Sequence, residues 1–302
     1  MPLNFAEVSP GLWVAQSRGL MMNTGVIISA GEACLIDPGL FPDEIGDIAR
    51  LLKEKDARPV VILLTHSHWD HIVGAEHFPG VKVIAQAEYV EFTRKNALDI
   101  VKSLTFWEKE MGLKRDGPFV IPQPTETFED TAVLCLGNMT LKLEHVPGHA
   151  PDQLAVRREG SGAVWISDIL SDIEIPYVSD NLAAYERTLA KVAQWDISAL
   201  VPGHGAWTTD EREIAARLAQ DRRYLGELQA RVERALAEGR TIEGAVALCA
   251  DMEIRNPNIN AESHVLNVES VYMELGGEGD PRKHGWTKDF FGEDVPLGED
   301  HE

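Results

Sequence analysis

The chain has 302 residues, of which 44% are hydrophobic and 25% charged, a balance typical of a soluble globular protein. Its 28 Lys and Arg residues against 49 Asp and Glu give a formal net charge of −21. This charge disfavours nucleic acid and anionic membranes as main partners. No run approaches the roughly 20 apolar residues of a membrane helix, and the first residues lack a signal-peptide pattern. Cys34, Cys135 and Cys249 predict no disulfide framework, so we expect a cytoplasmic protein.

Short apolar runs separated by turn residues predict a series of strands in the first two-thirds of the chain. They are expected at 12–14, 25–28, 33–36, 60–64, 81–84, 132–136, 139–146, 153–158, 163–167 and 199–201. Helical spacing predicts helices that begin at Pro42, near 87 and near 181, and 112–127 reads as a Pro-rich loop. We therefore expect a mixed α/β region over most of this length.

After Gly205 the sequence changes from strand patterns to helical patterns. Asp210 and Glu213 are placed as a capping box for a long helix, which Gly239 suits as an end. A further helix is expected over 261–275, either as ordinary packing or as a cap on the site or a dimer face. These patterns predict a mixed α/β domain over 1–207 and a mainly helical extension with an acidic tail over 208–302.

The strongest chemical signal is the segment 65–71, Thr-His-Ser-His-Trp-Asp-His, directly after the apolar strand 60–64. Clustered titratable groups repel or desolvate one another unless a cation holds them, so this density indicates a metal site. His66 and His68, two apart in an extended segment, point the same way. Asp70 and His71 follow as the chain turns and can face a second centre.

Three more candidates lie far along the chain, each just past a short apolar strand. His149 follows the turn 146–148, Asp168 ends the strand 163–167, and His204 follows Pro202 and Gly203. A sheet that aligns these strands would bring all the candidates to one rim.

Together these residues resemble the metallo-β-lactamase superfamily, through HxHxDH at 66–71, His149, Asp168 and His204. The resemblance covers about residues 10–207. It implies an α/β fold, a four-layer αβ/βα sandwich whose site lies at one edge. It also implies a ligand set in which His66, His68 and His149 hold one metal, Asp70, His71 and His204 hold another, and Asp168 bridges them.

The resemblance implies a hydrolase with two divalent metal ions, zinc first and iron or manganese as alternatives. A bridging hydroxide would attack a small-molecule ester, lactone or thioester, and Asp70 would orient it or move a proton. The glyoxalase II and lactonase branches are the nearest. An iron-dependent persulfide dioxygenase, a phosphodiesterase, a β-lactam hydrolase of the same fold, and a metal-retaining binding protein without turnover stay open as alternatives.

Residues of the substrate pocket are predicted from their proximity to the ligands along the chain. Trp69 lies between ligands, while Ile173 and Tyr177 follow the bridging Asp168. Each also has a simpler interpretation as a packed core or loop residue. Phe106 and Trp107 similarly form either an apolar lid or a helix stripe.

Overall fold

A computed structural model describes residues 3–115 and 117–286. Its first sheet has seven strands in the order of the chain. They are β1 (Ala6–Ser9), β2 (Leu12–Gln16), β3 (Asn23–Ser29), β4 (Glu32–Ile36), β5 (Arg58–Leu63), β6 (Lys82–Gln86) and β7 (Glu126–Phe128). The strands from β1 to β4 pair antiparallel, and those from β4 to β7 pair parallel. The parallel half needs crossover connections, which bring helices onto one face.

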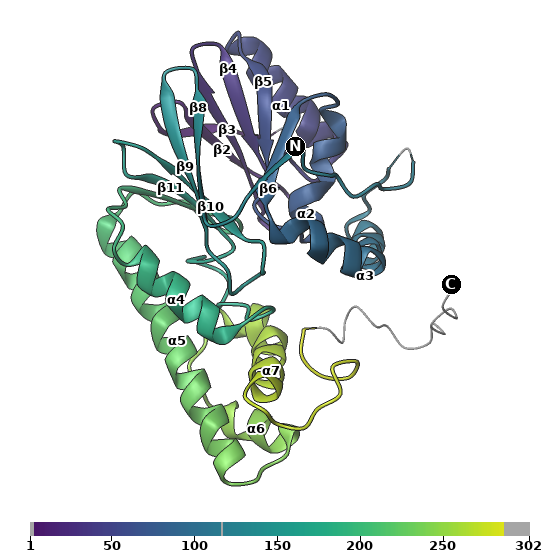
Figure 1. Cartoon of the computed structure of the whole chain (residues 1–302), viewed down its shortest axis with the longest axis vertical. Coiled ribbons are helices and arrows are strands. Elements are labelled where there is room, and N and C mark those ends of the chain that lie inside the picture. The colour runs from purple at the N-terminus through teal and green to yellow at the C-terminus, as the bar shows by residue number, and fades with distance from the viewer. Residues whose placement is uncertain (1–2, 116, 287–302) are drawn as a thin grey trace.

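The second sheet has five strands in the order β12-β11-β10-β9-β8. Their bounds are Thr131–Leu136 for β8, Met139–His145 for β9, Leu154–Arg158 for β10, Ala163–Ser167 for β11 and Ala199–Pro202 for β12. Only β11 and β12 pair parallel, and the crossover between them carries α4 (Leu182–Val192). Figure 1 shows the two sheets together, with α4 beyond the second.

Three apolar clusters fill the spaces between four layers. Leu35 of β4 packs with α1 (Pro42–Glu54) and α3 (Glu88–Met111), whereas the next residue, Ile36, packs with Trp165 of the second sheet. Ile166 points the other way from Trp165 and packs with α4. Successive side chains of a strand face opposite sides of the sheet, so both faces of each sheet are packed against another layer. This arrangement confirms the expected αβ/βα sandwich.

The C-terminal extension consists of α5 (Glu211–Ala237), α6 (Ile242–Cys249) and α7 (Pro257–Glu274), which lie together at one end of the molecule (Figure 1). Leu225 of α5 and Val271 of α7 share one buried cluster with Leu189 of α4 and Leu200 of β12. The helices thus extend the core of the second sheet outward. The division at residue 207 stays a prediction, and most of the expected acidic tail, 287–302, lies outside the described residues. No described helix is both long enough and apolar enough to span a membrane.

Gly74 marks a close backbone approach in the 3₁₀ helix Val73–His77, and it gives a stability prediction. A Cβ at this position would lie 1.8 Å from the Pro38 carbonyl oxygen. Gly74→Ala should therefore lower the free energy of unfolding by about 3 kcal/mol in urea titrations. Gly46→Ala in α1, where a Cβ meets nothing within 4 Å, should instead raise it by about 0.5–1 kcal/mol. Equal effects of the two changes would contradict this packing.

Candidate metal centre

The segment 66–71 leaves the buried end of β5 and enters the short helix α2 (Trp69–Ile72). His66 and His68 lie in the extended part, and Asp70 and His71 lie on the helix. His66 and His71 are completely buried, and Asp70 is nearly so. The change from extended chain to helix turns the second pair of side chains toward a different point from the first.

The three distant candidates reach the same place from the second sheet. His149 follows β9, Asp168 directly follows β11, and His204 follows β12 after Gly203. The structure brings all seven predicted side chains into two neighbouring groups. In each group the donor atoms lie within 4.8 Å of one another; one holds His66, His68, His149 and Asp168, and the other Asp70, His71 and His204.

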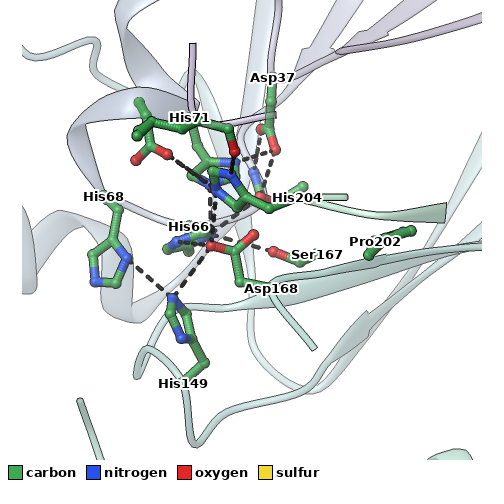
Figure 2. Close-up of polar contacts among 12 residues, drawn as sticks. Asp37, His66, His68, His71, His149, Ser167, Asp168, Pro202 and His204 are labelled. Atoms are coloured by element: carbon green, nitrogen blue, oxygen red, sulfur yellow. Dashed lines mark hydrogen bonds and ion pairs between the residues drawn. The ribbon is translucent and has the colours of Figure 1, made fainter. Parts of the chain in front are cut away.

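Asp168 lies between the two groups, as Figure 2 shows. Its Oδ2 atom is 3.5 Å from Nε2 of His149 in the first group. The same oxygen is 3.2 Å from Nε2 of His71 and 3.4 Å from Nε2 of His204 in the second. One carboxylate can therefore serve both groups.

Four of the histidines have their second ring nitrogen fixed by the surrounding protein. Nδ1 of His71 donates to Asp37 at 2.8 Å, that of His149 to the Tyr177 carbonyl at 3.2 Å, and that of His204 to the Leu20 carbonyl at 2.9 Å. Nδ1 of His66 lies 3.2 Å from the Thr65 hydroxyl. Such bonds hold the orientation of each ring, and in a neutral ring they direct the Nε2 lone pair toward the centre, as in metal sites.

Asp37 is a residue of this site that the sequence analysis did not find. It is completely buried, and it accepts hydrogen bonds from Nδ1 of His71 and from the backbone and hydroxyl of Thr65. Asp37 directly follows the apolar strand 33–36. This is the same signal that identified Asp168, so it was available in the sequence.

The donor atoms fit cations better than they fit one another. Nε2 of His66 and Oδ1 of Asp168 are buried and have no hydrogen-bond partner among the described residues. Burial, with neighbouring imidazoles, lowers the pKa of His66 and brings that of His68 to about 3, so both rings are neutral donors. Burial alone would raise the pKa of Asp70, but His71 and His204 lower it to about 2. Neutral imidazoles and ionised carboxylates are the donors that zinc, iron and manganese accept.

The surrounding backbone is shaped to make room for these groups. A Cβ on Gly203 would lie 1.9 Å from Oδ1 of Asp168, which explains the glycine before His204. Leu20, Asp37 and Ser167 have positive φ angles of 55°, 45° and 57°. Non-glycine residues in this region cost about 1–3 kcal/mol each and cluster at functional sites. All three contact a ligand histidine directly: Leu20 contacts His204, Asp37 contacts His71, and the Ser167 hydroxyl lies 3.3 Å from Nδ1 of His66.

The predicted pocket residues have different surroundings. Trp69 is 7% exposed and stacks on Trp107 with ring centroids 6.3 Å apart, in the cluster beneath α3. Tyr177 lies beside His149, with ring centroids 6.3 Å apart, and its hydroxyl donates to Asn260. Ile173 lies next to Gly205, since a Cβ on that glycine would be 3.2 Å from its Cγ1. Their roles toward a substrate stay predictions.

The fold and this site define a known class of protein. The family model of the metallo-beta-lactamase superfamily matches residues 18–204, and the chain belongs to this superfamily. The match covers the strands from β3 to β12, which belong to both sheets, and all seven candidate side chains. The resemblance read from HxHxDH and the three distant residues is thereby confirmed.

Several characterised proteins are similar to the chain. The acyl-coenzyme A thioesterase MBLAC2 of Gallus gallus is 26% identical over 215 residues, which cover 64% of this chain and 77% of the relative. The hydroxyacylglutathione hydrolase GloC of Haemophilus influenzae is 26% identical over 192 residues, 60% of this chain and 84% of the relative. These named relatives are hydrolases, in agreement with the predicted enzyme class.

A solved structure extends the likeness to the C-terminal helices. The sec-alkylsulfatase Pisa1 from Pseudomonas sp. has a TM-score of 0.74 and 16% identity, and the alignment covers 92% of this chain. The chain spans about half of that protein, 51% of its length. At this identity the likeness shows the fold alone, including an extension beyond the sandwich.

Proposed function

We propose that the protein is a dinuclear metal hydrolase that cleaves the thioester of a small acyl compound. The observation that carries the proposal is the pair of donor groups that share Asp168 between them. His66, His68 and His149 would hold one ion, and Asp70, His71 and His204 the other, with zinc as the first candidate metal. Bound there, two such ions would supply hydroxide at neutral pH and polarise the carbonyl oxygen under attack.

The protein's own side chains prepare this chemistry. Asp70 is an ionised carboxylate whose Oδ2 lies 3.1 Å from Nε2 of His204, so it can orient a water molecule or accept its proton. Asp37 fixes the ring of His71 through Nδ1. Asp70 and Asp168 together contribute two negative charges against four positive ones, which leaves the centre cationic and suited to a developing oxyanion.

The choice of a thioester is supported by the relatives and by the site's surroundings. The acyl-coenzyme A thioesterase and the hydroxyacylglutathione hydrolase both cleave acyl–sulfur bonds, according to their names. Ile173 and Tyr177 place apolar surface beside the donor groups, where an acyl chain would lie. The substrate would be a small molecule, as the names of these relatives suggest, and the proposed location is the cytoplasm.

The test is a substrate panel with one zinc-loaded preparation. Short acyl thioesters, matched oxygen esters, lactones, phosphodiesters and a β-lactam would be compared by kcat/KM, before and after chelation. We expect the thioesters to react fastest, and we expect chelation to abolish their hydrolysis. A preference for another bond, hydrolysis that survives complete metal removal, or oxygen uptake with a persulfide would contradict the proposal.

A further inference from the structure

The loop 171–178 connects Asp168 to α4 and contacts two of the candidate ligands. The Ser171 hydroxyl donates to the backbone carbonyl of His204 at 3.0 Å. The Tyr177 carbonyl accepts the bond from Nδ1 of His149 at 3.2 Å. The position of this loop therefore sets the ring orientation of His149 and the backbone position of His204.

The loop has no regular secondary structure, and side chains from the C-terminal extension hold its backbone. Asn260 donates to the Ile173 carbonyl at 2.8 Å. Asn267 accepts from Val178 N at 2.8 Å and donates to the Pro176 carbonyl at 2.7 Å. These bonds replace the partners that a strand or helix would supply for buried backbone groups.

A third side chain of the extension, Arg255, holds the first half of the loop. Its guanidinium donates to the carbonyl oxygens of Ser171 and Glu174. The charge is paired with Asp221 of α5 at 3.0 Å, and the two side chains are 8% and 2% exposed. A buried ion pair of this kind is weak evidence for stability but fixes geometry when all its donors are used.

The two asparagines are completely buried in α7, in a helix that otherwise packs through apolar residues such as Val268 and Val271. A buried amide costs free energy unless its donors and acceptors are bonded. Asn260 and Asn267 meet this requirement largely with loop atoms, rather than with the sheet. Packing of the helix alone would be served equally well by leucine.

We infer that Asn260 and Asn267, supported by Arg255, are positioning residues of the metal centre. They act through the loop 171–178, so the helical extension is part of the working site rather than a neighbour of it. This inference rests on the proposed function, because it concerns ligands that hold metal. The three residues lie beyond residue 204, where the family match ends. The inference gives them an effect on metal binding.

The test is zinc affinity, measured by competition with a chromophoric chelator, for Asn260→Ala and for a matched control. Tyr272→Phe is the control: this residue is also buried in α7, and its hydroxyl donates to the Arg240 carbonyl at 2.7 Å, away from the loop. We expect Asn260→Ala to weaken zinc binding about 10-fold, whereas Tyr272→Phe changes stability only. Equal zinc affinities for the two variants would overturn the inference.

Tyr177→Phe keeps the test valid if Asn260→Ala does not fold. It removes only the hydroxyl that donates to Asn260 at 3.0 Å and leaves the ring beside His149. We expect zinc binding about threefold weaker, as the loss of one hydrogen bond implies, and unchanged binding would overturn the inference. Wild-type protein that binds no zinc would instead refute the proposed function, so the two failures are distinguishable.

Discussion

Replacing Asp168 with Asn is expected to lower kcat/KM for thioester hydrolysis at least about 1,000-fold, equivalent to about 4 kcal/mol of transition-state stabilisation. Oδ2 of Asp168 lies within 3.2–3.6 Å of Nε2 of four histidines drawn from both donor groups. An amide keeps the shape but loses the negative charge that two cations would share. The zinc content should fall from near two per chain to near one.

Asp196→Asn is the matched control for this experiment. Asp196 follows α4 and is exposed, with no ion pair among the described residues. This change should leave both kcat/KM and zinc content unaltered. If the Asp168 variant kept full zinc content and near-normal hydrolysis, the carboxylate would not be shared between two ions.

Replacing Asp37 with Asn is expected to weaken zinc binding by about 10- to 100-fold. The Asp37 carboxylate accepts a hydrogen bond from Nδ1 of His71 through one oxygen and from Thr65 N through the other. An asparagine whose oxygen keeps the bond to Thr65 N would present its NH₂ group, a donor, to the His71 ring. The ring would then lose the partner that fixes its Nε2 lone pair toward the centre. Zinc affinity from chelator competition measures this effect.

The control for Asp37 is another buried carboxylate on the same side of the fold. Asp47 of α1 is 7% exposed and accepts a hydrogen bond from Leu3 N, which belongs to neither donor group. Asp47→Asn should change the free energy of unfolding without changing zinc affinity. The role given to Asp37 would be wrong if the two variants bound zinc equally well.

The strands and the seven clustered side chains could be predicted because each depends on a local signal, whereas the four-layer arrangement was implied by the resemblance to the metallo-β-lactamase superfamily. Continuous apolar runs mark buried strands, and a polar residue just past such a run lies at the rim of a sheet. His149, Asp168 and His204 all follow that rule, and the structure brings them to the segment 66–71. Their convergence also requires the two sheets to pack face to face, because β5 lies in the first sheet and β9, β11 and β12 lie in the second.

Other features left no periodic pattern in the sequence. All four residues of α2 are buried, so the helix has no amphipathic face to detect. β1 and β7 are edge strands of four and three residues, and β7 lies at the end of the segment predicted as a Pro-rich loop. α7 begins at Pro257 rather than near 261, because its first turn lacks the apolar spacing that marks the rest of the helix. Its N-cap residue, Asn256, makes no capping hydrogen bond and instead donates to the Ile173 carbonyl of the loop.

Polar contacts between distant elements were the hardest to foresee. The predicted capping box is only half right: Asp210 accepts from Arg212 N, but Glu213 bonds to Thr208 and Arg217. An asparagine in a helix gives no indication of which loop it contacts, so the roles of Asn260 and Asn267 emerge only from the folded chain. The sequence located the donor atoms but not the residues that position them.

The most direct measurement is metal analysis of zinc-reconstituted protein, combined with thioester hydrolysis as the metal is withdrawn. Two donor groups joined by Asp168 predict close to two zinc ions per chain, and activity that falls as the ions leave and returns on zinc addition. A chain that retains no metal after reconstitution, or hydrolysis that continues undiminished without it, would contradict the account.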